Sequence, residues 1–197
     1  MPVGCSATLY NAESCMVTAG HCLGGGGPSV HFNVPDSNSD GSTNNPPVAD
    51  QFPVLAESGV NGGVGADYGA MRIGTNSAGE TPVERYGSFI PLASSIPNSG
   101  TLTVNGYGVD SGQLNRSQTQ QFHDGPVLSV NSSSIEYDID VTFGNSGSSL
   151  VYNGEIVGVV THCSGGCENY GTRIDDAGFV QIRDIICNGE EPPPGGC

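Results

Sequence analysis

Short apolar runs separated by turn residues recur along almost the whole chain, and this feature most constrains its fold. Turn signals such as Asn153-Gly154 divide neighbouring runs, as they do in antiparallel hairpins. The 31 glycines and 13 prolines are spread along the length, and helix-forming residues are scarce. The pattern therefore predicts an all-β protein.

The expected strands form two successive groups. The first group is 7–10, 15–18, 29–32, 52–55 and 68–73, and the second is 101–107, 126–130, 134–140, 149–152, 156–161 and 171–174. Two groups of about six strands predict two six-stranded antiparallel barrels packed face to face, rather than a single sandwich. Apolar residues at helical spacing in 179–186 predict a short C-terminal helix.

The same pattern divides the chain into three parts. We expect an N-terminal barrel in residues 1–86, a C-terminal barrel in 87–187 and a tail in 188–197. The 197 residues suffice for two small barrels that share an interface. The tail is rich in Pro and Gly and cannot build a core.

Composition excludes several classes of partner. A net charge of −15 repels phosphate backbones, so we expect no nucleic-acid partner. No apolar run approaches the roughly 18 residues that a membrane-spanning helix needs. The seven cysteines predict disulfides rather than a zinc site, because Cys163 and Cys167 lack a second pair of ligands at suitable spacing.

Disulfides also indicate an oxidising compartment. We therefore expect a secreted or extracellular protein, with the periplasm as the alternative. No signal peptide is recognisable before Cys5, so we expect the targeting segment of an exported protein to be missing from this sequence.

Three segments carry the residue types of a catalytic triad. His21 follows an apolar strand, Asp67 stands at the mouth of another, and Ser146 lies in the string Gly-Asn-Ser-Gly-Ser. A serine hydroxyl needs a base, a carboxylate that orients the base, and N–H donors that face the developing oxyanion. The flanking glycines permit a tight turn that aims the N–H groups of Gly144 and Ser146 at one point.

On these motifs the chain resembles the chymotrypsin/trypsin superfamily of serine proteases, over nearly all residues up to Cys187. Residues 104–108 resemble the Gly-aromatic-Gly segment that opens the family's second barrel, and 158–161 resemble the strand that pairs with substrate. The resemblance implies a monomeric endopeptidase with His21, Asp67 and Ser146 as the triad. It also implies an acyl-enzyme, polypeptide substrates and no required cofactor.

The residue before Ser146 departs from the digestive members of this family. Those members pair a newly formed N-terminus with an Asp at this position, where the chain carries Asn145. We therefore expect activity that does not depend on an ammonium–carboxylate pair. In this respect the chain resembles bacterial members, including glutamyl endopeptidases.

The resemblance leaves specificity open. Asp140 lies where trypsin-like enzymes keep the carboxylate that binds Arg or Lys, although it also fits a hydrogen-bonded loop residue. Glutamyl endopeptidases use a His at the position of Val160, with Thr161 and His162 following here. These four residues are the candidates for substrate binding. A catalytically inactive binding domain is a further alternative, which the intact triad opposes.

The resemblance also implies disulfides and a calcium loop. The pairs are Cys5–Cys22 beside His21, Cys163–Cys167 beside the pocket and Cys15–Cys187 at the terminal helix, which leaves Cys197 unpaired. Asp36, Asn38 and Asp40 alternate as oxygen ligands do in calcium loops, so they are candidates for a structural calcium ion. A plain solvated turn is the alternative, because Pro47 stands at the position of the closing Glu.

Overall fold

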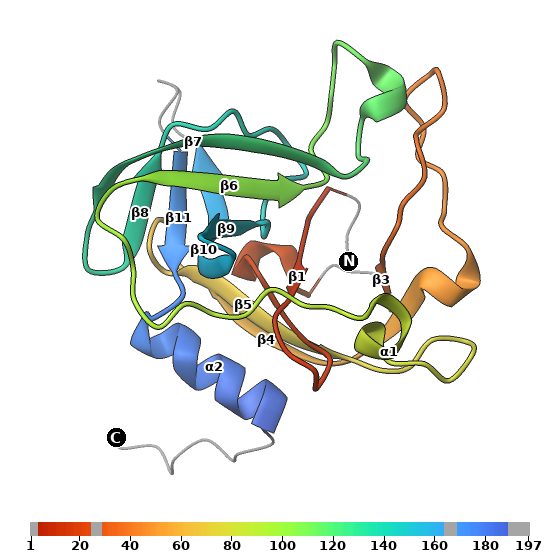
Figure 1. The fold of residues 1–197 in the computed structure, drawn as a ribbon, viewed down its shortest axis with the longest axis horizontal. Helices are drawn as coiled ribbons and strands as arrows, with labels where there is room; N and C mark the ends of the chain where they lie inside the picture. Colours follow the sequence, from red (N-terminus) through yellow and green to blue (C-terminus); the bar gives the residue numbers. More distant parts are fainter. Residues whose placement is uncertain (1–3, 25–28, 164–168, 189–197) are drawn as a thin grey trace.

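The computed structural model describes residues 4–24, 29–163 and 169–188. The first half is an antiparallel five-stranded sheet in the order β1-β2-β5-β4-β3. Its strands are β1 (Thr8–Leu9), β2 (Cys15–Thr18), β3 (Ser29–His31), β4 (Gln51–Asn61) and β5 (Asp67–Ile73). The sheet curls against the second half of the molecule (Figure 1).

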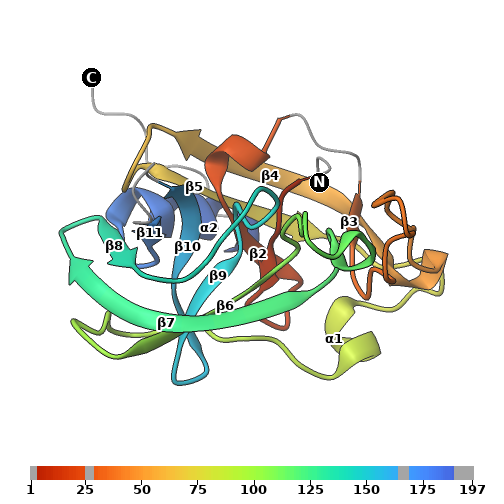
Figure 2. The ribbon, with the colours of Figure 1, turned by 90° about the horizontal axis from the view of Figure 1, so that it is seen from above.

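The second half is a closed antiparallel barrel in the order β10-β11-β8-β7-β6-β9. Its strands are β6 (Thr101–Gly106), β7 (Gln121–Val130), β8 (Ser134–Tyr137), β9 (Ser149–Tyr152), β10 (Glu155–Cys163) and β11 (Asn169–Arg173). Seen from above in Figure 2, β4 and β7 lie on opposite sides of the molecule, with β2, β9 and β10 between them.

The expected fold class is confirmed, with one difference in detail. The architecture is mostly β with a short C-terminal helix, but the described part of the first half has five strands and stays open. The segment between β3 and β4, residues 32–50, is rich in Ser, Asn and Pro and holds only the 3-10 turn η2 (Val48–Asp50). Proline has no N–H to donate and polar residues bury little surface, so this segment adds no strand to the sheet.

Two helices flank the sheets. The expected C-terminal helix is α2 (Ala177–Asn188), which packs against β5 (Figure 1). The second, α1 (Pro82–Tyr86), lies in a segment for which the sequence analysis predicted no helix or strand. Its signal was a capping box, because Thr81 and Glu84 each bond the other's backbone N–H.

The two halves share one of three hydrophobic clusters. One fills the first sheet and one fills the barrel. The third, at the junction, combines Val17 and Tyr68 of the first half, Val159 and Ile174 of the second, and Phe179 of α2. The rings of Tyr68 and Phe179 stack with centroids 5.0 Å apart. Each half therefore loses buried apolar surface if it moves away from the other.

Two of the expected disulfides are present. Cys5 pairs with Cys22, and Cys15 pairs with Cys187, which ties α2 to β2. The third expected pair involves Cys167, which lies outside the described residues, as does Cys197. Cys163 is exposed. In the described part of the chain, no helix is long and apolar enough to span a membrane.

Phe52 tests the core of the first sheet. Its side chain is fully buried and packs against the rings of Phe32 and Tyr86. Phe52→Ala should lower the free energy of unfolding by about 3–5 kcal/mol in urea titrations, because it loses apolar burial and leaves a cavity. Phe122→Ala is the control, since that ring is 77% exposed. Equal losses in the two variants would contradict this account of the core.

Candidate active site

The three candidate triad residues come from three different structural contexts. His21 lies in the 3-10 turn η1 (Gly20–Cys22) that follows β2. Asp67 is the first residue of β5, and Ser146 lies in the loop between β8 and β9. The η1 turn requires glycine at position 20, because a Cβ there would stand 1.9 Å from the carbonyl oxygen of Val60.

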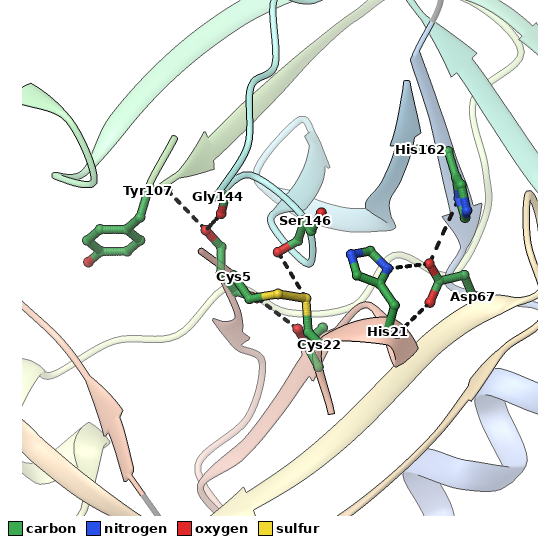
Figure 3. The surroundings of a disulfide bond; sticks show 10 residues. Cys5, His21, Cys22, Asp67, Tyr107, Gly144, Ser146 and His162 are labelled. Carbon is green, nitrogen blue, oxygen red and sulfur yellow. Dashed lines mark hydrogen bonds and ion pairs between the residues drawn. A yellow bond between two sulfur atoms is a disulfide. The ribbon is translucent and has the colours of Figure 1, made fainter. Parts of the chain in front are cut away.

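Two hydrogen bonds hold His21 on the Asp67 carboxylate. Nδ1 of His21 lies 2.6 Å from Oδ2 of Asp67, and the backbone N–H of His21 donates to Oδ1 at 3.0 Å. The Asp67 side chain is fully buried. Because the carboxylate accepts the Nδ1 proton, the neutral ring keeps Nε2 as a hydrogen-bond acceptor. Figure 3 shows the imidazole between Asp67 and Ser146.

The pKa of His21 is raised above its ordinary value of 6.5. The hydrogen bond to Asp67 is the largest cause, partial burial of the ring opposes it, and the charge of Asp67 adds to the rise. The site therefore favours the imidazolium form of His21 more than water does.

His162 lies on the other flank of Asp67, at the end of β10 (Figure 3). Its Nδ1 is 3.9 Å from Oδ2 of Asp67, and its ring centroid is 6.2 Å from that of His21. This nitrogen is buried and has no hydrogen-bond partner in the part of the chain that the structure describes. The sequence placed His162 among the substrate-binding candidates but gave no sign of its proximity to Asp67.

In the Ser146 loop, residues 142–148, backbone carbonyl groups accept hydrogen bonds, whereas the N–H groups of Gly144 and Ser146 have no acceptor among the described residues. The carbonyl before Gly144 accepts a hydrogen bond from the N–H of Val109 at 2.7 Å, and the carbonyl before Ser146 accepts from Ser148 at 2.9 Å. The N–H groups of Gly144 and Ser146 donate to no other described residue. These are the two donors that the sequence predicts for an oxyanion hole.

A pocket of about 610 Å³ opens beside these groups. The described residues that line it are His21, Asn61, Val141, Thr142, Phe143, Ser146, Val160, Thr161, His162 and Cys163. Three of the four candidates for substrate binding are therefore in its wall, and the hydroxyl of Thr161 donates to the carbonyl of Tyr170. The fourth, Asp140, is exposed and is not among these lining residues. Sequence reasoning missed Phe143, whose ring is 90% exposed at the pocket.

The calcium candidates use much of their polar capacity within their own loop. Oδ1 of Asp40 accepts hydrogen bonds from both the N–H and the hydroxyl of Ser42. The amide of Asn38 donates to the same hydroxyl, and Asn44 donates to the carbonyl of Asp36. These contacts are typical of a solvated turn. The calcium site stays a prediction.

One cluster of metal-ligating residue types occurs in the described part of the chain: Cys5, His21 and Cys22. Its two sulfur atoms are joined in a disulfide, so they are not thiolates. This cluster therefore does not offer the thiolate ligands that a metal ion such as zinc requires.

The shifted pKa of His21 can be measured directly. NMR titration of the imidazole Cε1–H should place it above 6.5, and Asp67→Asn should lower it, because the amide carries no charge. By linkage, the pair stabilises the fold fully below pH 6.5 and loses this contribution as the pH rises through the folded pKa. The control is His31, whose pKa burial lowers below 6.5 and which Asp67→Asn should not move. An unchanged His21 pKa in the variant would refute this assignment.

Comparisons with known proteins identify the family of the chain. A family model described as Trypsin matches residues 2–182. Among solved structures, a Glu endopeptidase in complex with MPD is 22% identical, with a TM-score of 0.68 over 93% of this chain and 85% of that one. The thermostable serine protease AL20 from an extremophilic microorganism is 18% identical, with a TM-score of 0.72 over 94% of this chain and 91% of that one.

Human heparin binding protein is a third structural neighbour, 19% identical with a TM-score of 0.69 over 98% of this chain and 89% of that one. No curated protein sequence matches significantly. These identities establish likeness of fold, whereas the family model covers nearly the whole chain. The chain therefore belongs to the trypsin family, with the chymotrypsin-like fold of its serine protease neighbours.

Proposed function

We propose that this protein is a secreted serine endopeptidase that hydrolyses peptide bonds through an acyl-enzyme on Ser146. One observation carries the proposal: the buried carboxylate of Asp67 holds His21 by Nδ1, and Ser146 lies on the other side of the ring (Figure 3). Two unpaired N–H groups and a pocket adjoin the serine. Trypsin-family membership supports polypeptides as the substrates.

In the acylation step, Nε2 of His21 takes the proton of the Ser146 hydroxyl as the oxygen attacks the substrate carbonyl carbon. The carbonyl π electrons move to its oxygen, which becomes an oxyanion facing the N–H groups of Gly144 and Ser146. When the tetrahedral intermediate collapses, the C–N bond breaks and His21 gives its proton to the leaving amine. Water then attacks the acyl-enzyme while His21 takes its proton. The ester bond to Ser146 breaks, and His21 returns the proton to the Ser146 oxygen.

Asp67 contributes by orienting the ring and by stabilising its charge. The imidazolium forms within 2.6 Å of a carboxylate that has no exposed surface, so water screens the attraction weakly. The same interaction with Asp67 raises the pKa of His21 in the enzyme without substrate.

The pocket supports apolar or acidic side chains in preference to Arg or Lys. Its described walls include Val141, Phe143 and Val160, which offer apolar surface, and His162, whose imidazole N–H can donate to a carboxylate. Asp140, the residue expected to bind Arg or Lys, has its side chain in solvent. Glutamyl endopeptidase-like specificity is the second candidate, because His162 lines the pocket, although it stands two residues after the position at which those enzymes carry their His.

A non-catalytic binding role is less well supported. The heparin binding protein among the structural neighbours shares the fold, but this chain has a net charge of −15. A surface of that sign repels a polyanion such as heparin. The candidate triad supports hydrolysis instead, because Asp67 bonds the His21 ring and Ser146 lies on the other side of that ring (Figure 3).

The disulfides support an extracellular location. Cys5–Cys22 and Cys15–Cys187 are structural crosslinks of the kind that persist in oxidising compartments. We propose that the protein is secreted and acts as a monomer.

Ser146→Ala tests the chemistry. The wild type should react with a fluorophosphonate probe and cleave peptides, and the variant should lose the label and roughly 10⁴–10⁶-fold in kcat, because it has no nucleophilic oxygen. Ser148→Ala is the matched control, since that hydroxyl lies two residues away and belongs to the same loop. Normal cleavage by Ser146→Ala, or an unlabelled wild type, would refute the proposed function.

A peptide library tests the specificity. We expect cleavage after apolar or acidic residues, and kcat/KM at least about tenfold lower after Arg or Lys, because no carboxylate lines the described pocket walls. His162→Gln should reduce cleavage after Glu selectively, whereas Asp140→Asn should leave the profile unchanged. A wild type that prefers Arg or Lys and loses this preference in Asp140→Asn would instead support a trypsin-like enzyme.

A further inference from the structure

Ser6 connects the first half of the molecule to the Ser146 loop through its hydroxyl and its backbone N–H. Its side chain is buried at 2% exposure, although it lies near the start of the described chain. Its hydroxyl donates to the carbonyl of Gly144 at 2.7 Å, and its N–H donates to the carbonyl of Ser146 at 2.7 Å. The hydroxyl accepts from the N–H of Tyr107 at 3.0 Å, and the carbonyl of Ser6 accepts from the hydroxyl of Thr18 at 2.8 Å.

We propose that Ser6 is a positioning residue that holds the Ser146 loop in the conformation that binds the oxyanion. The inference rests on the proposed function, because the loop needs a fixed conformation only if Gly144 and Ser146 stabilise a developing charge. Ser6 does not touch substrate or the reacting atoms.

The hydrogen bonds of Ser6 complete the restraint of two peptide groups. The peptide that follows Gly144 has its N–H on the carbonyl of Thr142 at 3.0 Å and its carbonyl on the Ser6 hydroxyl. The peptide that follows Ser146 has its N–H on the carbonyl of Val160 at 2.8 Å and its carbonyl on the Ser6 N–H. Both peptide planes are thus held at both ends, while the N–H groups of Gly144 and Ser146 donate to no residue in the described part of the chain.

Glycine makes this restraint necessary. Gly144 has a φ of +100° and Gly147 has a φ of +83°, conformations that L side chains rarely adopt. Because glycine samples many backbone conformations, the loop sequence alone does not select this one. A Cβ on Gly147 would lie 2.2 Å from the carbonyl oxygen of Ser6, so the two segments are in direct contact.

The restraint is made by uncharged groups. Asn145 stands where a carboxylate would accept an ammonium partner, and its side-chain amide packs against the backbone of Gly106 and Gly108, where a Cβ would come within 2.6 Å of it. The Ser6 hydroxyl supplies the link from the first half of the molecule. Since neither group titrates near neutral pH, this loop needs no ion pair to keep its shape.

Ser6→Ala tests the kinetic consequence. It leaves the Gly144 carbonyl and the Tyr107 N–H without their partner, and kcat should fall about 10–100-fold with KM nearly unchanged, because the loss appears only in the transition state. Ser37→Ala is the matched control: that buried hydroxyl also donates to a backbone carbonyl, that of Ser117 at 2.6 Å, and Ser37 does not line the pocket beside Ser146. Ser6→Thr keeps a hydroxyl and should restore most of kcat. Equal kcat in Ser6→Ala and Ser37→Ala would overturn the proposal.

NMR of the loop separates this proposal from the proposed function. In Ser6→Ala, the backbone N–H of Gly144 should show increased motion in ¹H–¹⁵N relaxation, whereas Ser37→Ala should match the wild type. This outcome supports the positioning role even if the wild type proves inactive. Unchanged relaxation at Gly144 overturns it even if the enzyme is active.

A measurement on the wild type covers the case in which Ser6→Ala does not fold. A hydroxyl held between Gly144 and Tyr107 should exchange slowly with water and give nuclear Overhauser effects to the Gly144 α-protons. Observation of these signals supports the proposal, and a hydroxyl proton in fast exchange overturns it.

Discussion

The buried carboxylate of Asp67 is the constraint on which the site depends. A charge with no exposed surface has to receive hydrogen bonds, because leaving it unpaired would cost several kcal/mol. The η1 turn supplies two of them, from the backbone N–H and the ring of His21. The turn can approach β4 this closely only because Gly20 has no side chain. The orientation of the imidazole is therefore a consequence of how the first half folds.

The second half completes the environment of the same residue. The hydroxyl of Thr172 on β11 donates to the backbone carbonyl of Asp67 at 2.8 Å, and His162 on β10 faces its carboxylate. The shared apolar cluster around Tyr68 and Phe179 holds the halves in this relation. Chemistry that needs His21 from one half and Ser146 from the other thus relies on ordinary apolar packing as much as on polar contacts.

Much of this could be predicted from the sequence, because the signals were local. Strands such as β2 and β9 match their apolar runs, and η1 and the Ser146 loop carry short motifs. The open, five-stranded form that the described residues give the first half and the full length of β4 were not predictable in this way. Residues 56–61 of β4 have little apolar periodicity, and their strand conformation comes from pairing with β5, including Asn61 opposite Asp67. The exposed side chain of Asp140 likewise depends on a loop whose course no local pattern specifies.

Ser6 shows why the supporting residues of a site are harder to infer than its reactive ones. A candidate triad serine or histidine can be recognised from the short motif around it in the sequence. Ser6 instead hydrogen-bonds to carbonyls about 140 positions away in the chain. Because its partners there are backbone atoms, which every residue has, the residue types at those positions do not reveal the contact. Because the Ser6 groups that bond the loop and the Asn145 side chain are uncharged, the Ser146 loop should keep its conformation across the pH range in which the protein stays folded. On the proposed mechanism, the acid limb of activity should come from His21, because the raised pKa of its imidazole arises from the Asp67 pair and not from the loop.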